Sequence, residues 1–131
     1  MFTYSNRTLI LWERIIDTKE RGYLTALTKI DTYDVLYSAN TFPPRIGLKV
    51  GNNFIGQLIF MPNGSALPQD DMVNGQVNLF YHLDDFQNVI DLLRNESSLY
   101  LFFSGSGGGF ENGIQTTEVV VGAGERETEA H

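Results

Sequence analysis

Residues 77–103 read VNLFYHLDDFQNVIDLLRNESSLYLFF, and this stretch decides the fold class. Apolar and polar residues alternate over residues 77–83, which is the period of a strand with one buried face. From Phe86 the apolar residues recur at helical spacing, and a continuous apolar run fills residues 99–103. Because five residues are too few for a helix, this run predicts a buried strand. The stretch is therefore a strand, a helix and a second strand.

The predicted helix covers about residues 84–94, and its apolar face comprises Phe86, Val89, Ile90 and Leu93. Asp84 followed by Gln87 has the form of a capping box, which predicts Asp84 as the N-cap. Two connections fit this unit. The strands are either joined by a parallel crossover or form an antiparallel pair with the helix packed across one end.

Five more strands are predicted outside this unit, in residues 8–16, 23–30, 46–50, 54–61 and 116–121. Residues 31–37 either extend the second of these or form a separate short strand. Gly51-Asn52-Asn53 predicts a hairpin, Asn112-Gly113 predicts a tight type I′ turn, and residues 62–75 predict a long exposed loop.

Together these elements predict a single domain over residues 1–131, with a polar C-terminal tail over residues 122–131. The expected fold class is α+β and β-rich. About seven mostly antiparallel strands form either a twisted sheet or a partly closed barrel, with one α-helix.

The composition excludes several functional classes. The chain has no cysteine, which excludes disulfides, thiolate catalysis and cysteine-ligated zinc. Its net charge is −7, and from Gly51 onward only Arg94 and Arg126 oppose eleven carboxylates, so we expect no nucleic-acid partner. There is no apolar segment of signal-peptide or membrane-spanning length, so we expect a cytoplasmic protein with no membrane partner.

His82, Asp84 and Asp85 form the one cluster that combines histidine with carboxylates. One interpretation makes His82 a general base or metal ligand that a carboxylate orients. The other places Asp84 and Asp85 at the start of the helix and His82 on the polar strand face. We favour the second, because residues around a strand-to-helix corner need not converge.

Three further groups of residues were weighed as sites. The glycine-rich segment 104–109 (SGSGGG) suits a phosphate cradle, but no lysine follows it, which favours a surface loop. Asp70, Asp71 and Asn74 offer oxygen ligands for calcium or magnesium without a known ligand spacing. Four aromatic residues either line a ligand pocket or fill the core: Trp12, Tyr33, Tyr37 and Phe42.

The predicted strands have more apolar surface than one helix can cover. Residues 9–16, 54–61 and 99–103 are apolar on both faces. A helix about 10 Å across shields about two strands spaced about 4.8 Å apart. Either the sheet curls so that its inner faces cover one another, as in a closed monomeric barrel, or a second copy supplies a layer. We expect a homo-oligomer, most simply a dimer, that buries part of the outer face of the sheet.

The predicted function is a non-enzymatic binding or assembly module that self-associates through its sheet. Its partner is another copy, a different protein or a small apolar ligand. The alternative is a small hydrolase or lyase that uses carboxylates and His82 on a barrel-like scaffold. No residue is assigned a catalytic, cofactor-binding or metal-ligating role, and no cofactor is expected.

Overall fold

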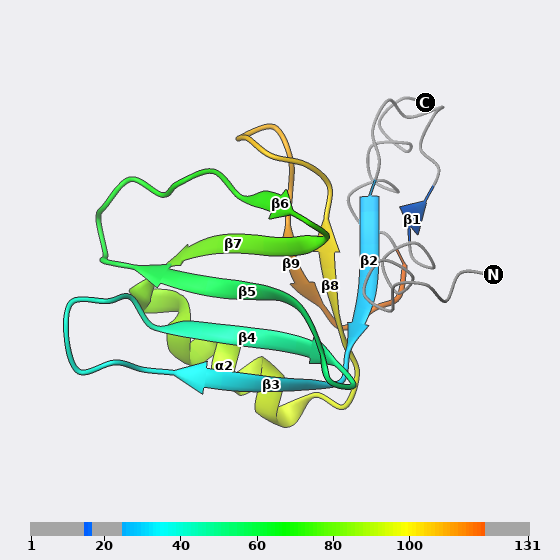
Figure 1. Ribbon diagram of the computed structural model, residues 1–131, viewed down its shortest axis with the longest axis horizontal. Helices are drawn as coiled ribbons and strands as arrows, with labels where there is room; N and C mark the ends of the chain where they lie inside the picture. Colours follow the sequence, from blue (N-terminus) through cyan, green and yellow to red (C-terminus); the bar gives the residue numbers. More distant parts are fainter. Residues whose placement is uncertain (1–14, 17–24, 120–131) are drawn as a thin grey trace.

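The computed structural model describes residues 15–16 and 25–119, and these form two sheets with one α-helix (Figure 1). The strands are β1 (Ile15–Ile16), β2 (Thr25–Ile30), β3 (Thr32–Leu36), β4 (Arg45–Val50), β5 (Asn53–Met61), β6 (Asp71–Val73), β7 (Gln76–His82), β8 (Leu99–Phe103) and β9 (Gly113–Gln115). A 3₁₀ turn, η1 (Leu83–Asp85), leads into α2 (Phe86–Asn95).

One sheet has the order β1-β2-β8-β9 and the other β3-β4-β5-β7-β6. All neighbours pair antiparallel except β5 and β7, which run parallel. Neither sheet closes on itself. The predicted β-rich α+β class is confirmed, in its open-sheet form, and the separate strands β3 and β6 raise the strand number above the expected seven.

The chain passes from one sheet to the other at Asp31. Its backbone N–H donates to the Lys49 carbonyl at 2.8 Å, and its carboxylate accepts from the Gly51 N–H at 2.7 Å. Both partners belong to the β4–β5 hairpin, so the corner is fixed to that hairpin. Residues 31–37 therefore contain a separate strand, β3, which runs in a different direction from β2 (Figure 1).

The main core lies between the five-stranded sheet, α2 and β8. Figure 1 shows α2 against one face of that sheet. Val89, Ile90 and Leu93 of α2 belong to the same buried cluster as Leu58 and Phe60 of β5. Leu99 and Leu101 of β8, Ile30 of β2, and Val77 and Leu79 of β7 complete this side of the cluster. Burial of each large apolar side chain contributes about 1.5–3 kcal/mol.

Two predictions at the central unit are wrong. Strands β7 and β8 belong to different sheets, so α2 is neither a crossover within one sheet nor a cap on an antiparallel pair. The capping box is also absent. Asp85 is the N-cap and makes no side-chain capping bond, while the Asp84 carboxylate accepts from the Asn63 side-chain amide at 2.9 Å. The 3₁₀ turn displaces the helix start by two residues.

The predicted turn at Gly51-Asn52-Asn53 is confirmed, and the predicted turn at Asn112-Gly113 is wrong. Gly51 (φ 60°) and Asn52 form the expected turn between β4 and β5. The Asn112-Gly113 prediction is wrong, since neither residue has a positive φ and Gly113 begins β9. The tight turn instead lies at Asn74 (φ 53°) and Gly75 (φ 79°), inside the predicted loop, and connects β6 to β7.

The predicted final strand is displaced as well. Residues 116–119 are not extended strand, and the last described strand, β9, ends one residue before them. The predicted strand 8–16 is described only at its last two residues, which form β1. The predicted tail over 122–131 lies outside the described residues.

Strand β5 approaches β7 so closely at Gly56 that only glycine fits there. A Cβ atom at Gly56 would lie 2.6 Å from the Val77 carbonyl oxygen, which is backbone and cannot rotate away. We expect Gly56→Ala to lower the free energy of unfolding by about 2 kcal/mol or more, because the parallel pair must separate. Gly108→Ala is the control, since a Cβ there meets nothing within 4 Å. Equal urea midpoints for the two variants would contradict this close approach.

Candidate functional site

The predicted histidine cluster does not assemble into one site. The His82 Nε2 atom hydrogen bonds the Ser65 carbonyl oxygen at 2.7 Å. Asp84 is bound to Asn63 through both its carboxylate and its backbone N–H. Within residues 25–119, no hydrogen bond links His82 to Asp84 or Asp85. These contacts fasten the loop after β5 to the end of β7.

Asp70 and Asp71 also serve different partners. Asp70 accepts from the Phe80 N–H with one oxygen, at 2.9 Å, and from the Asn112 amide with the other, at 3.0 Å. Asp71 accepts from the Asn78 amide at 2.8 Å. In the described part of the chain, no three histidine or acidic side chains gather as a metal site.

Asn112 holds the glycine-rich segment 104–109 in place. Its side-chain oxygen accepts from the Ser104 N–H at 2.7 Å, and its amide donates to the Gly105 carbonyl and to Asp70. Gly105 (φ 152°) packs against Phe110, whose ring lies 2.9 Å from the position of a Cβ there. Gly105 therefore allows the loop to pass close to the Phe110 ring.

Tyr81 is the titratable group with a resolved perturbation. Burial, together with the negative charges of Asp70 and Asp85, raises its pKa from 10.0 to about 12. Its ring stacks on Phe60 at 5.5 Å between centroids. This environment keeps the phenol neutral and makes it part of the core.

The four weighed aromatic residues do not converge on one pocket. Tyr37 is exposed and packs edge-on against Phe86 at 5.3 Å, Phe42 is exposed, and Trp12 lies outside the described residues. Tyr33 lines a pocket of about 240 Å³ beside the β2–β3 corner, together with Ile30, Asp31, Thr32, Leu93, Glu96, Ser97 and Leu99.

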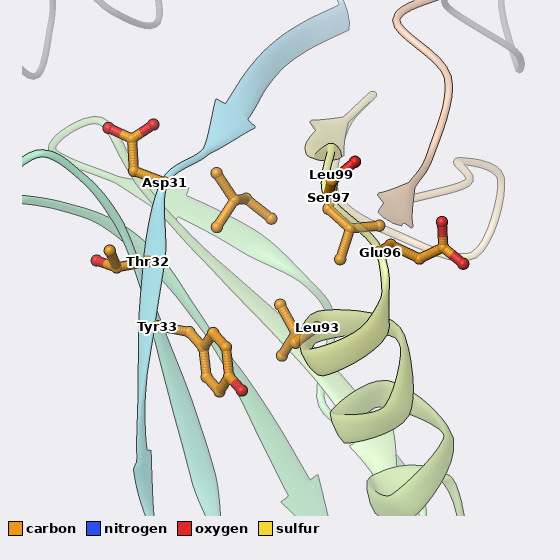
Figure 2. Close-up of a pocket in the computed structure, with 8 residues that line it drawn as sticks. Asp31, Thr32, Tyr33, Leu93, Glu96, Ser97 and Leu99 are labelled. Carbon is orange, nitrogen blue, oxygen red and sulfur yellow. The ribbon is translucent and has the colours of Figure 1, made fainter.

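This pocket, called the notch below, has a mixed polar and apolar lining. In Figure 2, Tyr33 from β3 and Leu93 from α2 project toward each other across the opening. The carboxylates of Asp31 and Glu96 point away from it. Ile30, Leu93 and Leu99 are buried members of the main core, so the notch reaches the core surface.

The surface with the least cover is the edge strand β3 and the residues after it. In the described chain, β3 has β4 on one side and no strand on the other. Exposed large apolar residues concentrate here, namely Val35, Leu36, Tyr37 and Phe42. This surface, called the β3 edge below, adjoins the notch through Tyr33. Val35 and Leu36 were not predicted as site residues, because the apolar run 35–37 does not reveal that β3 lies at the edge of the sheet.

Comparisons with protein-family models, curated proteins and solved structures find no match to this chain. Among the described residues, no helix has the length and apolar character needed to cross a bilayer.

Removal of the Asn112 side chain tests its role as a loop anchor. Asn112→Ala leaves the buried Ser104 N–H and one Asp70 oxygen without their partner. We expect the free energy of unfolding to fall by about 2 kcal/mol. Asn52→Ala, in the exposed β4–β5 turn, is the matched control and should change it by less than about 0.5 kcal/mol. Equal losses in a urea titration would show that the anchor is unimportant.

Tyr81 predicts a specific loss of stability in alkali. Its folded pKa exceeds its unfolded pKa, so its contribution is complete below pH 10 and is lost as the pH rises toward about 12. Between these values the loss is about 1.4 kcal/mol per pH unit. Urea unfolding at pH 9, 10 and 11 should show a shallower decline for Tyr81→Phe than for the parent chain. Parallel declines would disprove the shift.

Proposed function

We propose that this protein is a non-enzymatic assembly module that self-associates through the β3 edge. The observation that carries this proposal is the coincidence of an unpaired strand edge with four exposed large apolar side chains. An edge strand presents free backbone N–H and C=O groups that pair readily with another strand. Exposed apolar side chains beside them add a hydrophobic contribution to the same contact.

The two edges of the five-stranded sheet differ in how they are protected. Proteins commonly blunt edges by short strands and charged side chains. Strand β6 has three residues and begins with Asp71. Strand β3 has five, and its one charge, Asp34, is paired with Lys49 at 2.7 Å. The β3 edge therefore lacks the features that discourage strand addition.

Local charge also favours this surface. The chain carries a net charge of −7, which opposes contact between copies over most of its surface. Residues 31–50 balance Asp31 and Asp34 with Arg45 and Lys49. A second copy therefore meets little net repulsion at the β3 edge, whereas the acidic surfaces of two copies repel each other.

The outer face of the sheet is a less suitable contact. There Gln57 donates to Asn78 at 3.0 Å, and Asn78 donates to Asp71 at 2.8 Å. This polar ladder crosses three strands, and burying it against a partner would remove it from water without new partners. We therefore place the proposed contact at the edge of the sheet and not on its outer face.

The hydrolase or lyase alternative gains no specific support. It would use His82 with a carboxylate, and these groups are each held by a different loop residue. A general base must reach the proton that it removes, and His82 uses Nε2 in a 2.7 Å contact with a backbone oxygen. Assembly is the better account of the geometry.

Light scattering of the parent chain at tens of micromolar should give the mass of a dimer. Leu36→Asp should raise the dissociation constant at least tenfold, because a second carboxylate would enter a contact that already contains Asp34. Val73→Asp is the matched control, since Val73 and Leu36 are each 52% exposed and lie on opposite edges of the same sheet. A parent chain that stays monomeric, or equal weakening by both variants, would refute the proposal.

A further inference from the structure

We infer that two copies pair antiparallel through β3 about a two-fold axis at Val35, and that Tyr37 of each copy occupies the notch beside Tyr33 of the other. This inference rests on the proposed self-association and specifies its geometry. The two five-stranded sheets would then form one continuous sheet of ten strands, with both α2 helices on the same side.

The side chains of β3 separate cleanly into two faces. Tyr33 and Val35 lie opposite Leu48 and Ile46, which are fully buried, so they belong to the inner face. Tyr37 continues this row, because its ring packs against Phe86, which borders the core. Thr32, Asp34 and Leu36 form the outer row, which carries the ion pair to Lys49.

Exposure along the inner row is graded in a way that suits pairing with itself. Tyr33 is half-buried beside the notch, Val35 is 44% exposed, and Tyr37 is 63% exposed. Antiparallel pairing centred on Val35 sets the two valines opposite each other and Tyr37 of one copy opposite Tyr33 of the other. The exposed Tyr37 ring of one copy is therefore placed next to the notch beside Tyr33 of the other copy.

The notch has room for that ring. Its volume is about 240 Å³, and a cavity of about 150 Å³ already admits benzene. Its floor is formed by buried apolar residues, Ile30, Leu93 and Leu99. Its rim carries Thr32 and Ser97, which are hydroxyl residues, so a phenol hydroxyl can remain near polar groups while the ring is buried.

Other registers are less favourable. Centring the pair on Asp34 would set two carboxylates directly opposite each other, and like charges in this arrangement are destabilising. Centring it on Leu36 would leave Leu36 as the one residue of β3 that faces β3 of the other copy, whereas the Val35 register pairs residues 34–36. It would also move Tyr37 from Tyr33 to a position opposite Val35, away from the notch. The register at Val35 avoids both costs.

The chain has no cysteine, so single cysteine variants report this register without background. Under mild oxidation, Val35→Cys should form at least tenfold more disulfide-linked dimer than Val73→Cys, which sits on the opposite edge strand. Leu36→Cys should stay near the Val73→Cys level. In the Val35 register the two Leu36 positions are diagonal neighbours about 7–8 Å apart, and a disulfide requires Cβ atoms about 3.5–4.5 Å apart.

Blocking the notch tests the second half of the inference. Ser97→Trp, at the rim, should weaken the dimer at least tenfold by light scattering. Ser106→Trp, on an exposed loop outside the notch, should leave it unchanged. An unaffected Ser97→Trp dimer would show that Tyr37 does not enter the notch.

The outcomes separate this inference from the proposed function. A dimer in which Leu36→Cys cross-links as well as or better than Val35→Cys keeps the edge contact and overturns the register. A dimer in which neither variant cross-links above the Val73→Cys level also overturns it, and Leu36→Asp then decides the edge proposal. A monomeric parent chain overturns both.

Discussion

The structure depends on covering the apolar inner face of β5 and β7. Leu58, Phe60 and Leu79 are almost completely buried there, and a single ten-residue helix is too narrow to shelter them. The chain turns at Asp31, and this turn places Ile30 and β8 of the second sheet beside α2 over this face. The sheet does not curl into the closed barrel that was one of the two predicted solutions; a second open sheet and α2 cover this face instead.

The sequence predicted those elements whose signal is local and strong. The apolar run 99–103 is a strand with the predicted bounds, because a short segment buried on both faces needs no knowledge of its neighbours. The α2 prediction is two residues early at its start, since Asn63, a residue of a distant loop, binds the Asp84 side chain that capping would have used. Turns depended on context too. Asn74-Gly75 lies between two paired strands, whereas Asn112 uses its side chain to hold loop 104–109.

The site was less accessible to sequence reasoning than the fold. The sequence singles out His82, Asp70 and Asp84 as candidate site residues, but it does not identify their hydrogen-bond partners, which lie 10 to 42 positions away. The β3 edge was missed for a related reason. Val35 and Leu36 look like ordinary strand residues, and they become a surface only because the strand order places β3 outermost, which no local pattern reveals.

The arrangement that covers the core leaves the β3 edge of the sheet without cover. Helix α2 and β8 cover the centre of the sheet, and the corner at Asp31 carries β3 to its margin, where the inner row runs from half-buried Tyr33 to exposed Tyr37. Within one copy, the exposed end of this row has no further apolar cover, apart from the edge contact of Tyr37 with Phe86. In the proposed dimer, a two-fold axis across β3 would reverse the row and set its exposed end against the sheltered end of the other copy. Because Tyr37 and the notch beside Tyr33 lie at opposite ends of the same row, such a second copy would cover both.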